Sequence, residues 1–163
     1  MIIIKIFDTM ILIRLLQEID GMKIFNVWNL NSRYELWTTK EVESEVKTKA
    51  KDKLKELIED NIINFFEPAP LDALLEIKAK ANRLSLADCS LFYHCSKITN
   101  SVCLSDDNPL RKHFKRNGLN LHGTMGIYLK LKRDKTFPIQ IIENMFQELF
   151  SDPRIFPKAE NNN

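Results

Sequence analysis

The sequence predicts a three-layer α/β/α domain around a central parallel sheet of about five strands. Short β-branched and aromatic runs alternate with stretches of helical spacing, and these runs begin near residues 2, 35, 62, 102 and 119. Strands that alternate with helices form parallel sheets covered on both faces. The 163 residues, 44% of them hydrophobic, suit one domain with a real core. We place that domain at residues 1–150 and expect a loose tail over 151–163.

A buried strand is expected at the N-terminus, where the β-branched run over residues 2–7 is interrupted only by Lys5. Asp8 with Thr9 can cap the helix that follows, and Gly21 can end it. The remaining elements of the first half are, in order, a helix over 10–19, a helix over 23–31, a strand over 34–39, a long charged helix over 40–60 and a strand near 62 that Pro68 and Pro70 stop.

In the second half, the short apolar run Val102–Leu104 predicts a buried strand, and the acids Asp106 and Asp107 follow it after Ser105. Asp107 or Asn108 can cap the next helix, because Pro109 suits a first helical turn. The other elements expected here are helices over 71–81 and 86–98, a helix over 109–117, a strand over 119–122 and helices over 123–132 and 138–150.

The composition excludes several classes of protein. The three cysteines are odd in number and lack zinc-finger spacing, and the three histidines complete no recognisable ligand set. An odd number of cysteines argues against a disulfide framework and favours the reducing cytoplasm. The apolar N-terminus contains Lys5 and Asp8, so it predicts neither a signal peptide nor a membrane span.

Positive charge gathers in one stretch although the formal net charge is only +2. Between Asn108 and Lys135 there are eight Lys and Arg residues against one acid, Asp134. A solvated surface is the commoner cause of such a stretch, and a surface that meets phosphate is the alternative. The candidates for contact with nucleic acid are Arg111, Lys112, Lys115 and Arg116.

Acidic residues stand where an open α/β sheet places its ligands. Asp8 follows the first expected strand, and Asp106 and Asp107 follow the fourth. Ligands of such sheets bind at the carboxyl ends of the strands, beside the point where strand order reverses. If the two strands are neighbours, these acids share one crevice. The alternative is a simple turn before a capped helix.

Asp88 is unusual because helical spacing places it in a stripe with Leu91, Phe92 and Cys95. An ionised carboxylate in an apolar stripe is costly unless something pairs with it. The spacing from Ser85 to Asp88 also fits a capping box, and a cap can coexist with a role in a site.

A further acid would come from Glu41, Glu43 or Glu45, and the helical periodicity does not choose between the last two. Converging carboxylates raise one another's pKa, and Mg²⁺ or Mn²⁺ relieves that repulsion. Acids, a divalent metal and nearby basic residues together point to phosphodiester hydrolysis by a metal-activated water.

Four segments resemble, in order, the motif blocks of PIN-domain nucleases: FDTMILIRLL, TTKEVESEV, LSLADCSLFYHC and CLSDDNPLRKHFKRNGLNLHGTMGIYLKLK. The similarity covers about residues 1–132 and looks closest to prokaryotic VapC-like toxins. It implies a Rossmann-like sheet, a pocket for Mg²⁺ or Mn²⁺, and cleavage of single-stranded RNA. It also implies two candidate protein partners, an antitoxin and a second copy of the chain.

The resemblance also implies roles for individual residues. Glu45 is selected over Glu43 because the family's Val-x-x-Glu spacing falls on Val42 and Glu45. The implied catalytic acids are Asp8, Glu45, Asp88 and Asp107. The implied metal ligands are Asp8, Asp88, Asp107 and the extra acid Asp106, with Thr9 and Ser105 as hydroxyls that orient carboxylates.

Two other functions compete with the nuclease. A receiver-type signalling domain is also acidic and doubly wound, but its paired acids follow the first strand rather than the fourth. A PIN-like module that binds RNA or protein with weak catalysis is the second alternative. Met10 favours this module, because the family often has a small polar residue there. A metal titration separates the module from the nuclease.

Overall fold

The computed structural model describes residues 1–153 and contains one sheet of five strands. All neighbouring strands pair in parallel. The strands are, in chain order, β1 (Ile3–Phe7), β2 (Tyr34–Thr38), β3 (Ile63–Phe65), β4 (Ser101–Leu104) and β5 (Leu121–His122). The predicted parallel five-stranded sheet is therefore confirmed, with each strand near its expected start.

Helices connect the strands and continue beyond β5. They are α1 (Thr9–Ile13), the π-helical η1 (Arg14–Glu18), α2 (Met22–Leu30), α3 (Lys40–Glu45), α4 (Thr48–Glu59), α5 (Leu71–Lys80), α6 (Leu86–Lys97), α7 (Asn108–Arg116), α8 (Thr124–Arg133) and α9 (Ile139–Phe150). Of the tail expected over 151–163, residues 154–163 lie outside the described part of the chain.

The strand order is β3-β2-β1-β4-β5, so β1 lies between β2 and β4 at the centre of the sheet. The register sets Phe7 beside Leu104, and the backbone N–H of Asp8 donates to the Leu104 carbonyl over 3.0 Å. The order reverses between β1 and β4, which makes their carboxyl ends the topological switch point. The neighbouring strands that the sequence analysis required are thus present.

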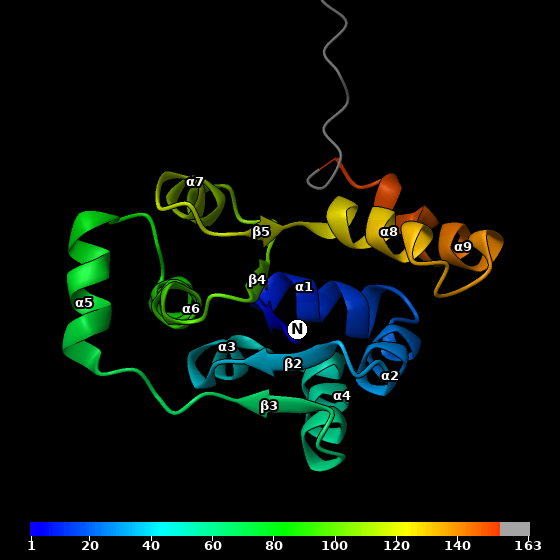
Figure 1. Ribbon diagram of the computed structural model, residues 1–163, viewed down its shortest axis with the longest axis horizontal. Coiled ribbons are helices and arrows are strands. Elements are labelled where there is room, and N and C mark those ends of the chain that lie inside the picture. The colour runs from blue at the N-terminus through cyan, green and yellow to red at the C-terminus, as the bar shows by residue number, and fades with distance from the viewer. Residues whose placement is uncertain (154–163) are drawn as a thin grey trace, which may run out of the picture.

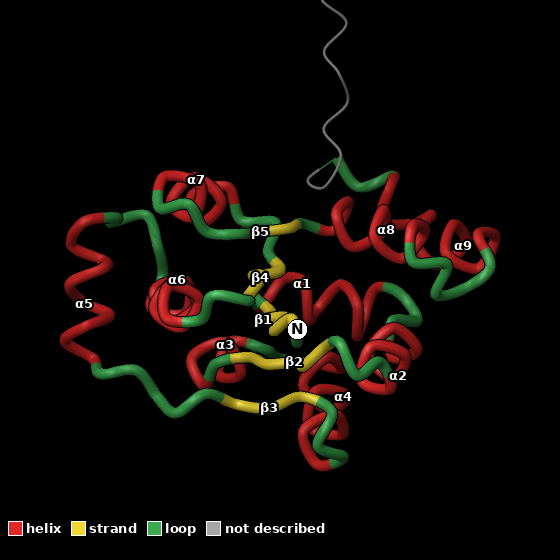
Figure 2. Tube along the Cα trace, viewed as in Figure 1, coloured by secondary structure: helices red, strands yellow, loops and turns green. Residues whose placement is uncertain are grey.

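Two layers of helices cover the sheet, as Figures 1 and 2 show. Helices α5, α6 and α7 lie on one side, and α1, α2, α4, α8 and α9 lie on the other (Figure 1). Phe7 of β1 packs against Phe25 and Trp28 of α2, with ring centroids 5.1 and 6.1 Å apart. None of the helices within residues 1–153 is long and apolar enough to cross a membrane.

The prediction of one long helix over 40–60 is wrong, because the chain breaks between α3 and α4. Val46 and Lys47 are extended, and Thr48 has a φ of 64°. The break lets Val46 be buried while α4 takes its own direction and buries Ala50, Leu54 and Leu57. It also ends α3 at Glu45. No Gly or Pro marks this break in the sequence.

The helix expected over 10–19 is present but widens to π geometry from Arg14 onward. Its end is closed by Gly21, whose N–H donates to the Leu15 carbonyl over 2.9 Å. A Cβ at Gly21 would overlap that carbonyl, so the close approach requires glycine. The π segment begins at an arginine with only 4% of its surface exposed.

Candidate active site

Asp8 lies at the carboxyl end of β1 and caps α1. Its Oδ1 accepts a hydrogen bond of 2.6 Å from the Thr9 N–H, and its Oδ2 accepts one of 2.5 Å from the Ser105 hydroxyl. Burial raises the pKa of the Asp8 carboxyl to about 7, and the charges of Asp88 and Asp107 add to the rise. The bonds from Ser105 and Thr9 act on this pKa in the opposite direction.

Ser105 follows β4 and joins Asp8 to Asp107. While its hydroxyl donates to Asp8, the same oxygen accepts from the Asp107 N–H over 3.1 Å. Asp107 in turn caps α7, because its Oδ2 accepts from the Leu110 N–H over 2.8 Å. The helix cap expected from the sequence is present, and it holds Asp107 at the end of the strand next to Asp8.

Asp88 is part of a complete capping box at the start of α6. Its Oδ2 accepts from the Ser85 N–H over 2.9 Å, and its own N–H donates to the Ser85 hydroxyl over 3.1 Å. Burial raises the pKa of the Asp88 carboxyl, and the charges of Asp107 and Glu45 raise it further, against the hydrogen bonds from Ser85. Asp88 is therefore both a cap and a neighbour of the other acids.

Glu45 and Glu43 have different surroundings. The Thr9 hydroxyl donates to Oε2 of Glu45 over 2.9 Å, which ties the end of α3 to the residue after Asp8. Glu43 instead forms a surface ion pair with Lys40 at 3.3 Å. Of the two glutamates that periodicity left open, Glu45 is the one hydrogen-bonded to the residue that follows Asp8.

These four acids, Asp8, Glu45, Asp88 and Asp107, come from four separate elements, and we refer to them as the acidic cluster. In each of the three aspartates, one carboxylate oxygen accepts a hydrogen bond from a backbone N–H. These bonds hold the aspartates at the starts of helices. Within residues 1–153 no three His, Cys, Asp or Glu side chains are grouped as a metal site. Over the same range, no hydrogen bond uses Oδ1 of Asp88, Oδ1 of Asp107 or Oε1 of Glu45.

Asp106 is oriented differently from the cluster. Its carboxylate pairs with the buried guanidinium of Arg14 and accepts from both the N–H and the hydroxyl of Thr124. Gly123 makes room for this contact, since a Cβ there would overlap the Asp106 carboxylate. The sequence analysis placed Asp106 among the metal ligands. Since Arg14 and Thr124 occupy Asp106, we leave it out of the proposed ligand set.

A basic cavity of about 510 Å³ lies between the end of α5 with the loop that follows it and the helix α7. Its lining comes from the segment that precedes Asp88 in the chain and from helix α7, which Asp107 caps, so the chain runs from this cavity into the acidic cluster on both sides. Four cations line it: Lys80, Arg83, Lys112 and Arg116. Lys80 lies 3.8 Å from Glu76, and within residues 1–153 the other three form no ion pair.

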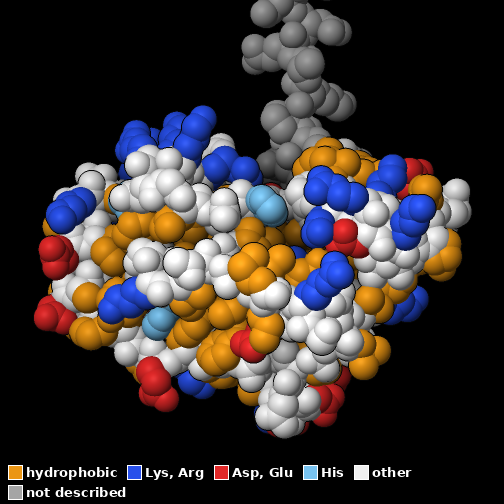
Figure 3. Space-filling view, in the orientation of Figure 1, with side chains coloured by type: hydrophobic (Ala, Val, Ile, Leu, Met, Phe, Trp, Pro, Cys, Tyr) orange, Lys and Arg blue, Asp and Glu red, His pale blue; other side chains and the backbone are white. Residues whose placement is uncertain are grey.

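The four residues predicted to contact nucleic acid divide between two places. Lys112 and Arg116 line the basic cavity, whereas Arg111 and Lys115 line a separate cavity of about 570 Å³ near β5. The space-filling view shows one group of lysine and arginine side chains over α7 and another over α8 (Figure 3). Lys80 and Arg83 were missed by the sequence analysis. Their only signal is the polar segment KAKANRLS, which covers the end of α5 and the loop before α6.

Comparison with known proteins agrees with this architecture. A family model described as a PIN domain matches residues 4–158. The crystal structure of PAE2754 from Pyrobaculum aerophilum is similar, with a TM-score of 0.57 and 14% sequence identity over 82% of this chain and 99% of that chain. At such identity the likeness concerns the fold alone. No curated protein matches the chain.

The family match spans nearly all of the chain and includes every member of the acidic cluster. Proteins of this family are generally nucleases, that is, hydrolases acting on nucleic acid. The closer likeness to VapC-like toxins stays a prediction, as do the roles of the individual residues. The resemblance to PIN-domain nucleases is confirmed, and the chain belongs to the PIN-domain family.

Proposed function

We propose that the protein is an endoribonuclease that cleaves single-stranded RNA with Mg²⁺ or Mn²⁺ bound at the acidic cluster. The observation that carries the proposal is a group of four acids that influence one another electrostatically, two of them on segments that continue into a cavity lined by four cations. Carboxylates alone would repel a phosphodiester, whereas cations alone would bind it without cleaving it. Their adjacency suits a metal-assisted phosphodiester hydrolase.

The side chains present fit a hard divalent cation. Asp8, Asp88 and Asp107 offer only oxygen donors, which Mg²⁺ and Mn²⁺ prefer. When bound, such a metal would lower the pKa of an attacking water and stabilise charge on the leaving oxygen. Ser105 orients Asp8, and the caps of α6 and α7 orient Asp88 and Asp107.

Glu45 is the proposed general base. Thr9 fixes one of its carboxylate oxygens, and no hydrogen bond from residues 1–153 reaches the other. The unoccupied oxygen can accept a proton from water at the edge of the cluster. Glu45 is also exposed, which keeps that oxygen accessible.

The basic cavity is the proposed path of the RNA strand. Lys80, Arg83, Lys112 and Arg116 can contact phosphates, which gives affinity without reading the sequence. The preference for single strands follows from the family resemblance. Lys80 and Arg83 approach from one wall and Lys112 and Arg116 from the other, so the strand would lie between them.

A cleavage assay tests the proposal. The purified chain should cut end-labelled single-stranded RNA with Mg²⁺ or Mn²⁺ and be inactive in EDTA, with duplex RNA and single-stranded DNA as comparison substrates. Asp88→Asn should lose activity and keep its fold. Asp72→Asn is the matched control, because Asp72 is an exposed acid in the first turn of α5. Cleavage that persists in EDTA, or in Asp88→Asn, would contradict the proposal.

The toxin role belongs to the same proposal, together with an antitoxin partner and a homodimer. Expression of the wild-type chain should then arrest bacterial growth, and Asp88→Asn should not. Light scattering of the purified chain measures whether it dimerises. A PIN-like module without catalysis would instead bind metal and RNA but leave the RNA intact. In this structure Asp8 is held by Thr9 and Ser105, and Met10 takes no part in those bonds.

A further inference from the structure

Lys5 is a charged residue in the middle of the central strand, and only 5% of its surface is exposed. Its Nζ lies over the rings of Trp28 and Tyr34, 4.6 and 4.4 Å from their centroids. Within residues 1–153 this side-chain nitrogen makes no hydrogen bond or ion pair. Ring faces replace only part of the hydration that a buried ammonium loses. Lys5 therefore lacks an oxygen partner.

The Lys5 side chain lines a cavity of about 360 Å³, which we call the amino-end cavity. The cavity also touches Asn100, directly before β4, and Asn120, directly before β5. It therefore lies toward the amino ends of the strands, whereas Asp8 lies at the carboxyl end of β1. The acidic cluster and this cavity are at opposite ends of the sheet.

Positive charge dominates the amino-end cavity. Lys130 and His122 line it together with Lys5. Burial lowers the pKa of His122, and the charges of Lys5, Arg111, Lys130 and Arg133 lower it further. Burial likewise lowers the pKa of Lys5 to about 8, with Lys130 adding to the effect and the acid Asp134 opposing it. An anion in this cavity would relieve the repulsion among these groups.

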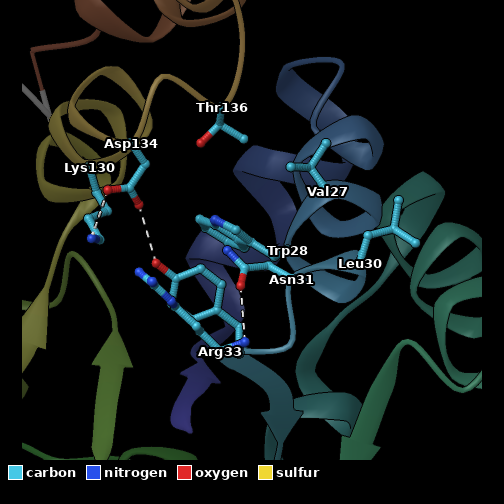
Figure 4. Close-up of a pocket in the computed structure, with 9 residues that line it drawn as sticks. Val27, Trp28, Leu30, Asn31, Arg33, Lys130, Asp134 and Thr136 are labelled. Atoms are coloured by element: carbon cyan, nitrogen blue, oxygen red, sulfur yellow. Dashed lines mark hydrogen bonds and ion pairs between the residues drawn. The ribbon is translucent and has the colours of Figure 1, made fainter. Parts of the chain in front are cut away.

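One wall of the cavity is fixed by an ion pair and a hydrogen bond. Asp134 pairs with Lys130 at 2.9 Å, as a dashed line in Figure 4 shows, and accepts from the Tyr34 hydroxyl over 3.2 Å. Tyr34 and Lys130 also line a second cavity of about 380 Å³, which Arg33 borders. Asp134, which caps α8, thus holds Lys130 of α8 and Tyr34 of β2 in place beside both cavities.

We propose that the amino-end cavity binds a phosphate group, with Lys5, Lys130 and His122 contacting its oxygens. Phosphate suits the cavity because its negative charge at neutral pH matches the ammonium groups of Lys5 and Lys130, while a neutral His122 can still donate through a ring N–H. The side-chain amides of Asn100 and Asn120 add neutral donors at the rim. The volume exceeds that of phosphate alone, so the source is either free phosphate or a small phosphomonoester such as a nucleotide. This site is separate from the proposed nuclease chemistry.

The test is a titration of the full chain, free of divalent metal at pH 7, with inorganic phosphate, AMP and acetate as probes. Affinity is measured by calorimetry, and the place of binding by backbone amide shifts in NMR spectra. Lys5→Met keeps the length and apolar contacts of the side chain while removing its charge. Lys55→Met is the matched control, because Lys55 is an exposed lysine on α4.

Inorganic phosphate should bind saturably and shift the amides of Asn100, Asn120 and His122. Lys5→Met should weaken that binding about tenfold or more, since it removes a hydrogen bond to a charged group, and Lys55→Met should not. If Lys5→Met does not fold, His122→Gln and Lys130→Met should weaken the binding instead. Tighter binding of AMP would identify a phosphomonoester as the ligand, and equal affinities would identify free phosphate.

Three results would overturn the proposal. The first is equal phosphate affinity in the wild type and in a folded Lys5→Met variant. The second is a set of amide shifts confined to α7, which would mean that phosphate occupies only the basic cavity. The third is acetate binding as tightly as phosphate, which would show that the cavity does not select a doubly charged anion.

Discussion

The Ser105 hydroxyl donates a 2.5 Å hydrogen bond to Oδ2 of Asp8 and so joins the carboxyl ends of β4 and β1. The same hydroxyl accepts from the Asp107 N–H, which sets the second aspartate relative to the first. One small side chain therefore positions two of the proposed metal ligands. Removing this hydroxyl should therefore reduce activity more than it reduces the stability of the fold.

Ser105→Ala should lower RNA cleavage about tenfold, because it removes the hydroxyl that orients two ligands. It should also move the acidic limb of the pH–rate profile upward. The Ser105 bond lowers the pKa of Asp8, so removing that bond raises this pKa further. Ser96→Ala is the control, because Ser96 is exposed and donates only to the Tyr93 carbonyl. An unchanged profile in Ser105→Ala would mean that Asp8 does not limit the reaction.

Glu45→Gln should reduce turnover about a hundredfold or more, whereas Glu43→Gln should stay within about twofold. Glutamine at 45 can still accept from Thr9 but is a far weaker base. Glu43 contributes only a surface ion pair with Lys40. Turnover on the same RNA is the measurement. A larger loss in Glu43→Gln would mean that the family's glutamate corresponds to Glu43 and that the alignment with the family is wrong by two residues.

Mn²⁺ at a hundredfold excess over its dissociation constant should stabilise the fold by about 2.7 kcal/mol, a rise in Tm of roughly 5–10 °C. Replacing both Asp8 and Asp107 by asparagine should abolish that rise and increase the metal-free Tm. Asparagine still caps a helix, so the second effect isolates the removed charge. The paired control is Asp52→Asn with Asp72→Asn, both on the exposed surface. An identical Mn²⁺ shift in the site double variant would exclude the acidic cluster as the metal site.

The metal-free protein should lose stability as the pH rises from about 4 to 7, through the titration of Asp8. Its folded pKa of about 7 lies above the ordinary value of 3.8, so the stabilising contribution is complete below pH 4 and gone above pH 7. The total is on the order of 4 kcal/mol. Urea unfolding in EDTA, compared with Asp8→Asn, isolates this difference. If the difference in unfolding free energy between the two proteins stays constant across that range, the carboxyl of Asp8 has an ordinary pKa.

Lys112→Gln combined with Arg116→Gln should weaken RNA binding and reduce the salt slope by about one for each phosphate that is no longer neutralised. Binding is measured in the Asp88→Asn background so that the RNA stays intact. Lys51→Gln with Lys55→Gln on α4 should leave the slope unchanged. Lys115→Gln alone should weaken RNA binding less than Lys112→Gln or Arg116→Gln alone, because Lys115 lies outside the basic cavity. Equal losses in all variants would indicate a diffuse electrostatic contact.

The sheet could be predicted because its central strands are buried on both faces and so appear as continuous apolar runs. The caps at Asp8 and Asp107 were also evident, since an aspartate between a strand and a helix is well suited to accept from the first free N–H groups of that helix. The strand order could not be predicted from the sequence, which indicated the shared crevice only on the condition that the first and fourth strands are neighbours. Whether β1 lies beside β4 depends on long-range pairing, which short-range spacing does not contain.

The missed features depend on tertiary contacts. The break at Thr48 carries no turn residue, and α3 ends before it at Glu45. Arg14 looks like one polar position on an apolar helix, yet the fold buries it against Asp106. Lys80 and Arg83 are distant in sequence from α7, so only the packing of α5 and α6 makes them line one cavity with it.

The pairing of Ile4 with Ser101 has a consequence for synthesis of the protein. The first strand leaves the ribosome long before the partner that completes its carboxyl end, so Asp8 is made well before Ser105 and Asp107. A chain that stops before β4 therefore holds Asp8, Glu45 and Asp88 without the serine that orders them. Products that stall before β4 should therefore lack the proposed nuclease activity, which would require the segment that carries Ser105 and Asp107 to be made and paired with β1.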